Sequence, residues 1–472
     1  MGGDFLSKMY FLQNRWKLEN NKLYYYGLRC GDNLFKNTVK LSKKQKIIIS
    51  SLPSKLSSDE IKALDKLINV QVVTENELKH TPKSLSEAHF CKTCCANDFI
   101  IPGLEFDENG ICPMCKNAKD VKNLKSVVPL VEDIPHAKNS RFDAALFYTG
   151  GKDSTFLLYY LAKVKKLRIL ALTWEIPYIS ESAKKSIENA KKRFSNVEFI
   201  TRSMSSNDLR KIYRKLYELS GNTCACPSLA YVLFYPELVA NHIPYFFAGN
   251  EPVQMLGLYY NHMSPKFVYN LNENMTLSFL INAGRVLTLR PPLKKGQLQT
   301  LLSMRQLTKK KSTVMDFFGY HNPLVSNIVT AIHEVPKLIS PLKKSLRASS
   351  KTGNIPAFVH LDFNDICGGK YDWTKVKSIL VDECGWVPPD DSKKALHTSC
   401  KIERCKDHSQ FLKFYNCESK MIPFSALEIS LASQNSLVSR EEIMYEMENL
   451  LGFSLEELPE CSLMCEFMKE DK

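Results

Sequence analysis

The chain has 472 residues, 44% of them hydrophobic, and carries a formal net charge of +14. This length is typical of about three domains, and the hydrophobic content excludes a wholly disordered chain. No apolar run approaches the ~20 residues needed to span a bilayer. The start, "MGGDFLSKMY", has no signal-peptide pattern, and Leu6 stands where a myristoylation motif needs Ser or Thr. We therefore expect a cytoplasmic protein without a membrane partner.

The basic residues are spread widely, in runs such as Lys163–Lys166, instead of being concentrated in one module. This distribution is typical of a solvated lysine-rich surface and also fits a small anionic ligand such as ATP or a sugar nucleotide. A nucleic-acid partner is not expected on this ground. The chain also has fifteen cysteines, which in a reducing compartment indicate metal ligation, reactive thiols or simple burial more than disulfides.

Residues 1–88 are predicted to form a small helical, winged-helix-like extension. Helical spacing occurs over 41–52 and over 57–68, and Ser57 with Glu60 provides a capping signal for the second helix. The stretch 69–75, "NVQVVTE", is predicted to be a short strand.

Four cysteines in 89–118 follow the pattern C-x2-C, seventeen residues, C-x2-C; they are Cys91, Cys94, Cys112 and Cys115. Two such pairs can hold one tetrahedral metal ion, and four thiolates suit Zn²⁺. An iron–sulfur cluster or unligated thiols remain as alternatives. The segment is therefore predicted to be a zinc ribbon, and because four protein ligands close the coordination shell, we expect a structural role.

Residues 138–295 alternate between strand and helix patterns. Strands are expected at 143–149, 168–175, 196–203 and 243–250, with helices at 154–166, 182–194, 207–220 and 228–242. This order predicts an α/β fold in which a parallel sheet has helices on both faces, with ligands at the carboxyl ends of the strands. Residues 296–472 are predicted to be mostly helical.

The stretch "TGGKDST", residues 149–155, joins the first of these strands to the first helix. Two glycines allow close backbone approach, and N–H groups at a helix start form an anion site. Lys152 adds a positive charge, and Asp153 beside a phosphate implies either an intervening Mg²⁺ ion or a structural cap. The spacing matches neither the Walker A motif nor the dinucleotide-binding motif.

This stretch resembles the S-G-G-x-D-S loop of the N-type ATP pyrophosphatase (PP-loop) superfamily. The resemblance implies an adenine nucleotide alpha hydrolase-like fold and an ATP-dependent adenylation that releases pyrophosphate, and Lys152 and Asp153 would take part in it. It also implies that the end of the second strand, at Thr173, contacts adenine or ribose. The residues expected to bind the nucleotide are Thr149, Gly150, Gly151, Lys152, Asp153, Ser154, Thr155 and Thr173.

The order of motifs, with "PGLEFDENGICPMC" before the loop, is similar to the bacterial N-acetyl sugar amidotransferases of surface-polysaccharide (lipopolysaccharide) biosynthesis. This resemblance implies a sugar or nucleotide-sugar substrate whose carboxylate or acetamido group is adenylated before ammonia displaces AMP. Because the chain shows no glutaminase signature, a separate glutaminase partner is expected to supply the ammonia. The expected cofactors are ATP, Mg²⁺ and Zn²⁺.

Further candidates follow the loop. Cys224 and Cys226 precede a predicted helix, whose start lowers thiol pKa, so one of them is a candidate reactive thiolate; buried thiols are the simpler alternative. Glu251 follows the predicted strand at 243–250, at a place that resembles a Gly-Glu pair of the family, so the resemblance implies a substrate or Mg²⁺ contact in the catalytic site; a polar turn residue is the alternative. The pattern H-x2-C-x4-C-x2-H, from His397 to His408 through Cys400 and Cys405, could bind a metal, although a buried cluster is the preferred interpretation.

Two other functions remain open. The cysteine pair and the positive charge favour a PP-loop sulfur transferase that thiolates a tRNA or a small molecule. The third alternative is a zinc-dependent scaffold with a degenerate loop, which the intact Gly150, Gly151, Asp153 and Ser154 disfavour.

Overall fold

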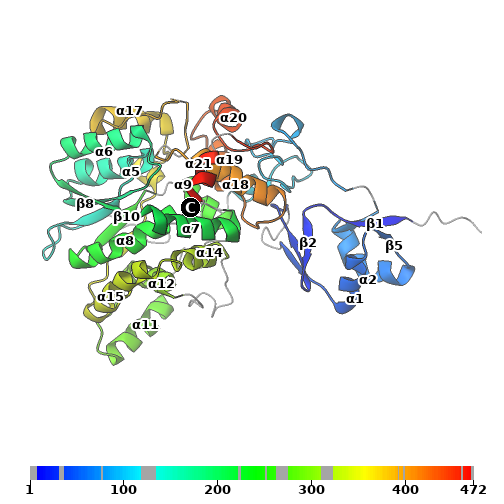
Figure 1. Cartoon of the computed structure of the whole chain (residues 1–472), viewed down its shortest axis with the longest axis horizontal. Helices are drawn as coiled ribbons and strands as arrows, with labels where there is room; N and C mark the ends of the chain where they lie inside the picture. The colour runs from blue at the N-terminus through cyan, green and yellow to red at the C-terminus, as the bar shows by residue number, and fades with distance from the viewer. Residues whose placement is uncertain are drawn as a thin grey trace, which may run out of the picture.

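A computed structural model describes residues 8–30, 37–75, 78–118, 134–221, 225–249, 252–261, 275–309, 323–391, 393–396, 399–458 and 461–468. A small N-terminal unit lies at one end of the molecule, and a larger body built around a β-sheet lies at the other (Figure 1). The last helices of the chain lie between the two.

The N-terminal unit contains two three-stranded antiparallel sheets and two helices. Its sheet orders are β5-β1-β6 and β2-β3-β4. The elements are β1 (Met9–Leu12), β2 (Trp16–Glu19), β3 (Lys22–Tyr25), β4 (Thr38–Lys40), α1 (Lys43–Ser50), β5 (Ser54–Lys55), α2 (Ser58–Asn69) and β6 (Val73–Thr74). The two helices and the strand at 73–74 agree with the sequence patterns, whereas β1–β5 were not predicted. The unit has its own core, in which Leu23, Leu64 and Val72 are fully buried.

One arginine joins this unit to the body. Arg15 is 7% exposed and donates hydrogen bonds to the backbone oxygens of Tyr26, Phe414 and Tyr415, the first and second at 2.7 Å and the third at 2.5 Å. The last two oxygens belong to the final turn of helix α18 (Glu403–Tyr415), where a cation also compensates the negative end of the helix dipole. Burial lowers the pKa of Arg15 below its ordinary value.

Residues 78–118 carry the four cysteines and pack against the body. Regular structure here is limited to a 3-10 turn, η1 (Leu85–Glu87), and helix α3 (Pro113–Lys116). The Gln434 amide donates to the Met114 carbonyl oxygen at 3.0 Å, and Ser433 Oγ lies 3.1 Å from Cys95 Sγ. Both of these contacts come from helix α19 (Phe424–Gln434).

The body is built on a five-stranded sheet of order β11-β10-β7-β8-β9, in which every neighbouring pair is parallel. This confirms the predicted α/β fold. The strands are β7 (Ala144–Phe147), β8 (Ile169–Glu175), β9 (Val197–Ser203), β10 (Tyr245–Ala248) and β11 (Ala357–Val359). Strand β11 lies beyond the range 138–295 predicted for the nucleotide-binding domain, so a segment expected to be helical contributes an edge strand.

Alternate residues of the strands face two different cores. Ala144 and Leu146 of β7 pack with helices α5 (Lys152–Tyr159), α6 (Glu181–Arg193) and α17 (Trp373–Cys384). Ala145 and Phe147 pack with α8 (Cys226–Ala240) on the other face. Both faces are covered, as expected for a parallel sheet of buried strands.

The remaining helical elements complete the body. They are the π-helical turn η2 (Tyr160–Val164), α7 (Ser206–Ser220), α9 (Pro252–Tyr260), α11 (Met275–Leu287), α12 (Gln297–Thr308), α14 (Pro323–Ile332), α15 (Pro336–Thr352), α16 (Phe363–Ile366), α20 (Arg440–Asn449) and α21 (Cys461–Met468). Within the described ranges, none of the helices has the length and apolarity needed to cross a membrane.

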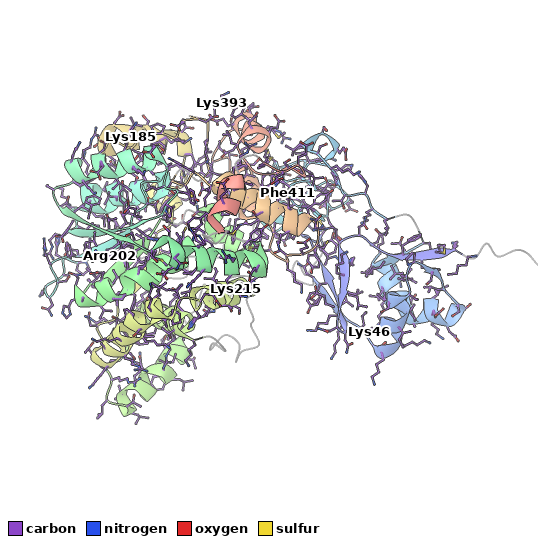
Figure 2. All side chains as sticks on the ribbon, in the orientation of Figure 1. Lys46, Lys185, Arg202, Lys215, Lys393 and Phe411 are labelled. Carbon is purple, nitrogen blue, oxygen red and sulfur yellow. The ribbon has the colours of Figure 1, made fainter. Side chains whose placement is uncertain are left out.

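Basic side chains occur at widely separated points of the surface. Figure 2 shows Lys46 on the N-terminal unit and other cations around the body, while Phe411 lies in the interior. The labelled cations of the body are Lys185, Arg202, Lys215 and Lys393.

A buried carboxylate stabilises the edge of the sheet opposite the strands' carboxyl ends. Asp143 is fully buried and accepts hydrogen bonds from the backbone N–H groups of Ala137 (2.7 Å) and Arg168 (2.8 Å), from the Arg168 guanidinium (2.5 Å) and from His136 Nδ1 (2.8 Å). Burial alone would raise the pKa of Asp143, but the hydrogen bonds from Arg168 and Ala137 outweigh burial and hold this pKa well below its usual value.

We expect Asp143→Asn to lower the free energy of unfolding at pH 7 by about 2 kcal/mol, because charge-assisted hydrogen bonds are lost. Since the folded-state pKa is depressed, the contribution of Asp143 is present above its unfolded pKa of about 4 and is lost as the pH falls below it. Urea unfolding should therefore show a stability difference between the two proteins that narrows from pH 7 towards pH 3. A difference that stays constant over this range would contradict the assignment.

Candidate active site

The loop at 149–155 is closed by its own hydrogen bonds. Ser154 Oγ lies 3.0 Å from Thr149 Oγ1, accepts from the Thr149 N–H at 3.2 Å and donates to the Gly151 carbonyl oxygen at 3.2 Å. Gly151 is the N-cap of α5, whose first residue is Lys152. The helix therefore begins inside the loop, and its first N–H groups point toward the carboxyl end of β7, where an anion would be stabilised.

Two glycines allow the backbone to come this close. Gly150 has φ +73°, and a Cβ there would lie 2.5 Å from the Ala183 carbonyl oxygen of α6. A Cβ on Gly249, just after β10, would lie 2.8 Å from the Ser154 nitrogen. Both positions require glycine, because any side chain would collide with backbone atoms.

A cavity of 460 Å³ opens above the loop at the carboxyl ends of β7, β8 and β10. It is lined by Thr149 and Asp153 of the loop, by Trp174 at the end of β8 and by Gly249. This is the position at which ligands bind to open parallel sheets. The volume lies in the range of pockets that hold small molecules.

The end of β8 presents buried polar atoms without partners. Thr173 Oγ1 and Trp174 Nε1 have no hydrogen-bond partner in the part of the chain that the structure describes. Thr173 is 4% exposed, and Trp174 lines the cavity. Buried polar groups are nearly always hydrogen-bonded. An acceptor on a ligand in the cavity would satisfy Trp174 Nε1. Thr173, whose side chain points to the other face of the strand, is not among the residues that line the cavity.

The charged pair of the loop is held by aromatic side chains from the C-terminal region. Lys152 is 3% exposed, and its Nζ lies 4.8 Å from the ring centroid of Tyr371 and 4.4 Å from that of Trp373. Lys152 Nζ and Tyr371 Oη both donate to Asp153 Oδ1, at 2.5 and 2.8 Å. Burial, together with the Lys152 charge, lowers the pKa of Lys377.

These contacts fix one oxygen of Asp153. The other, Oδ2, takes no hydrogen bond from the residues that the structure describes, and Asp153 lines the cavity. A carboxylate oxygen of this kind is a suitable Mg²⁺ ligand. Sequence reasoning missed Tyr371 and Trp373, because a Tyr-Asp-Trp stretch before a helix is indistinguishable from an ordinary capped helix start.

The opposite wall of the cavity comes from the C-terminal helices. Glu403, Lys406 and Gln410 of α18 and Glu428 of α19 line it, and Gln410 and Glu428 are almost completely buried. These residues carry no sequence motif, and only the fold brings them to the loop. The wall gives the cavity donors and acceptors that can orient a second, polar substrate.

Two thiols line the same cavity. Cys226 is the first residue of α8 and lies 3.6 Å from Tyr213 Oη. Cys400 precedes α18 and forms an isolated antiparallel bridge with Ile179. A helix start favours the thiolate form of a cysteine, so Cys226 occupies a suitable position for a nucleophile.

Other predicted residues are placed as follows. Cys224, Glu251 and His397 lie outside the described residues. Cys405 and His408 are buried, and His408 Nδ1 lies 3.1 Å from the Gly452 carbonyl oxygen. Among the described residues the four-cysteine group of 89–118 is the one set that could hold a metal ion, so no metal site around Cys400 and Cys405 is supported.

The four-cysteine group matches a single metal ion. The sulfur atoms of Cys91, Cys94, Cys112 and Cys115 all lie within 4.8 Å of one another, with Cys91–Cys115 at 3.9 Å and Cys94–Cys112 at 3.8 Å. A tetrahedral ion with metal–sulfur bonds of about 2.3 Å places its ligands about 3.8 Å apart. A four-iron cluster would hold its thiolates farther apart, because several irons and sulfides separate them.

No protein-family model matches the sequence, and a search of curated proteins finds no match. One similar solved structure is the U34-tRNA thiolase NcsA from Methanococcus maripaludis with its [4Fe-4S] cluster. It is 16% identical over 62% of this chain and 96% of its own length, with a TM-score of 0.22. The fold assignment therefore rests on the strand order and the loop geometry described above.

Proposed function

We propose that the protein is a member of the N-type ATP pyrophosphatase superfamily and adenylates a substrate with ATP, forming AMP and pyrophosphate. The observation that carries the proposal is that one cavity joins the loop at 149–155 to Trp174 Nε1, which has no hydrogen-bond partner among the described residues. The loop suits a pyrophosphate, and the end of β8 suits the adenosine of the same molecule.

In this mechanism an oxygen of the substrate attacks the α-phosphorus of ATP and pyrophosphate leaves. Asp153 would hold a nucleotide-bound Mg²⁺ ion, and such an ion would supply positive charge to the leaving group. The N–H groups at the start of α5 hold the departing phosphates. A second nucleophile then attacks the activated carbon, and AMP leaves with the substrate oxygen.

For this second nucleophile we propose sulfur. Cys226 and Cys400 both line the cavity that contains the loop, so a persulfide loaded onto one of them by a persulfide donor would reach an adenylated substrate without leaving the site. Its outer sulfur would attack the activated carbon as AMP leaves. A thiol would then cleave the sulfur–sulfur bond, which releases the thiolated substrate and leaves a disulfide on the cysteine. The protein would then be a sulfur transferase, with a tRNA or a small molecule as substrate.

An amidotransferase acting on a sugar is the second candidate. It is supported by the order of motifs in the sequence and by the contact of the cysteine segment with α19, which also lines the cavity. Ammonia from a separate glutaminase would then take the place of sulfur. In either case we propose that the four cysteines hold Zn²⁺.

We expect that incubation with ATP, Mg²⁺ and substrate yields AMP and pyrophosphate; ADP and phosphate as products would overturn adenylation. With candidate tRNA or sugar acceptors, a persulfide donor with a thiol reductant and, separately, ammonia are supplied, and the product is identified by mass spectrometry. Cys226→Ala and Cys400→Ala should abolish sulfur incorporation while leaving pyrophosphate release within about threefold of wild type. Cys384→Ala, which removes a buried thiol that does not line the cavity, serves as the control.

A further inference from the structure

Helix α11 (Met275–Leu287) turns its apolar side chains away from the protein. Five of its large apolar residues are exposed by 56–85%: Met275, Phe279, Leu280, Val286 and Leu287. Leu289, which follows the helix, is 94% exposed. On a helix with 100° per residue these five fall within one arc, and so large an apolar patch on a protein surface marks an interaction site.

Polar side chains of the same helix contact the body. Asn282 Oδ1 accepts from the Leu293 N–H at 2.8 Å, and Arg285, 7% exposed, donates to the backbone oxygens of Pro291 (2.7 Å) and Ser350 (3.0 Å). Polar contacts therefore fasten α11 to the body, and its apolar face is left for a partner. This arrangement is the reverse of an ordinary surface helix, which buries its apolar face.

The sequences of α11, α12 and α15 are predominantly basic, although Lys337 of α15 is paired with Asp208. The stretches 275–309 and 336–353 contain no Asp or Glu. Their Lys and Arg residues are Arg285, Arg290, Lys294, Lys295, Arg305, Lys309, Lys337, Lys343, Lys344, Arg347 and Lys351. Helices α11, α12 and α15 lie together at one end of the body, away from the N-terminal unit (Figure 1).

Three kinds of partner could bind the apolar face of α11, and they differ in how well they fit it. A second copy of the chain would bring two basic faces together, which is unfavourable. RNA would pair with the cations but would leave Phe279, Leu280 and Leu287 against its phosphates. An anionic lipid surface offers acyl chains for the apolar arc and headgroup charges for the cations around it.

We propose that α11 is an interfacial helix that docks the protein on an anionic membrane surface. Its thirteen residues, about 20 Å long, would lie in the headgroup plane and not cross the bilayer. The expectation from sequence of no membrane partner rested on spanning segments, a signal peptide and a myristoylation motif, none of which this inference requires. The active-site cavity lies elsewhere on the body, so docking is independent of the proposed chemistry.

The test is flotation of the full chain with vesicles of phosphatidylcholine alone and of equal phosphatidylcholine and phosphatidylglycerol. We expect binding to the anionic vesicles only. The variant Phe279→Ser/Leu280→Ser/Leu287→Ser should bind them at least about tenfold more weakly, because the apolar contacts are removed. Ile47→Ser, at an apolar side chain that is 72% exposed on the N-terminal unit, should bind like wild type.

A second variant, Lys294→Glu/Lys295→Glu, tests the contribution of charge. It should also bind the anionic vesicles at least about tenfold more weakly, and its binding should depend less on salt. Unchanged thermal unfolding would show that each variant is folded. Failure of the wild-type protein to float would overturn the proposal. A dimer that the triple-serine variant converts to a monomer would assign the face to a second copy. Binding to tRNA that depends on the lysines but not on Phe279 would assign it to RNA.

Discussion

Replacing Asp153 with Asn is expected to lower the rate of ATP-dependent pyrophosphate release by about a thousandfold. One Asp153 oxygen is held by Lys152 Nζ and Tyr371 Oη, which leaves the other to contact the metal ion on the nucleotide. An amide is a poor ligand for Mg²⁺ and loses the negative charge, so charge on the leaving group is no longer neutralised. Removing one such preorganised interaction typically costs a factor of 10²–10³ or more.

The matched variant for this prediction is Tyr371→Phe. It keeps the ring beside Lys152 but removes the hydroxyl that donates to Asp153 at 2.8 Å. We expect a several-fold rise in the Mg²⁺ concentration needed for half-maximal ATP binding, measured by calorimetry, with unchanged thermal stability. Wild-type turnover in Asp153→Asn would show that Asp153 has no role in the reaction. Wild-type Mg²⁺ dependence in Tyr371→Phe would show that the Tyr371 hydroxyl does not support Mg²⁺ binding and that this residue contributes only packing.

Replacing Cys112 with Ser is expected to release the metal ion and to unfold residues 89–118. Cys112 is fully buried, and its sulfur lies among three others that fit one tetrahedral ion. Because such a segment folds only when it binds its structural zinc ion, the binding free energy contributes directly to folding. We therefore expect Cys112→Ser to lower the free energy of unfolding by several kcal/mol and Tm by about 10 °C or more. Metal content by mass spectrometry should fall from one equivalent towards zero.

Cys95→Ser provides the control in the same segment. Cys95 is equally buried but is not among the four cysteines proposed to bind the metal ion, and it contacts Ser433 of α19 instead. This variant should keep the full metal content and lose at most about 1–2 kcal/mol of stability. Equal metal loss in both variants would contradict the assignment of ligands. If Cys112→Ser slows pyrophosphate release and Cys95→Ser does not, residues 89–118 support the cavity through their contact with α19.

Local patterns were sufficient to predict the loop and most of the sheet. Apolar strands followed by helices placed β7, β8, β9 and β10, and the glycines, Asp153 and Ser154 marked the anion site. These features are local, because each depends on residues within one strand, turn or helix. The cysteine spacing was informative for the same reason.

What the sequence did not reveal depends on contacts between distant residues. Strand β11 has only three residues, Ala357–Val359, and pairs with β10 more than a hundred positions earlier. Tyr371 reaches Asp153 across 218 positions, and α18 faces the loop only after the sheet has formed. No periodicity or motif marks such residues, since their role is defined by tertiary packing and not by their neighbours.

The contact of Arg15 with the end of α18 has a consequence for attempts to shorten the protein. The first half of α18 faces the cavity through Glu403, Lys406 and Gln410, while its last two carbonyl groups rest on the Arg15 guanidinium. A protein starting at residue 78 would keep the loop, the sheet and the four cysteines. It would nevertheless lose the cation that holds the far end of one cavity wall. The N-terminal unit therefore helps to hold the cavity wall in place, and removing it should disturb the site.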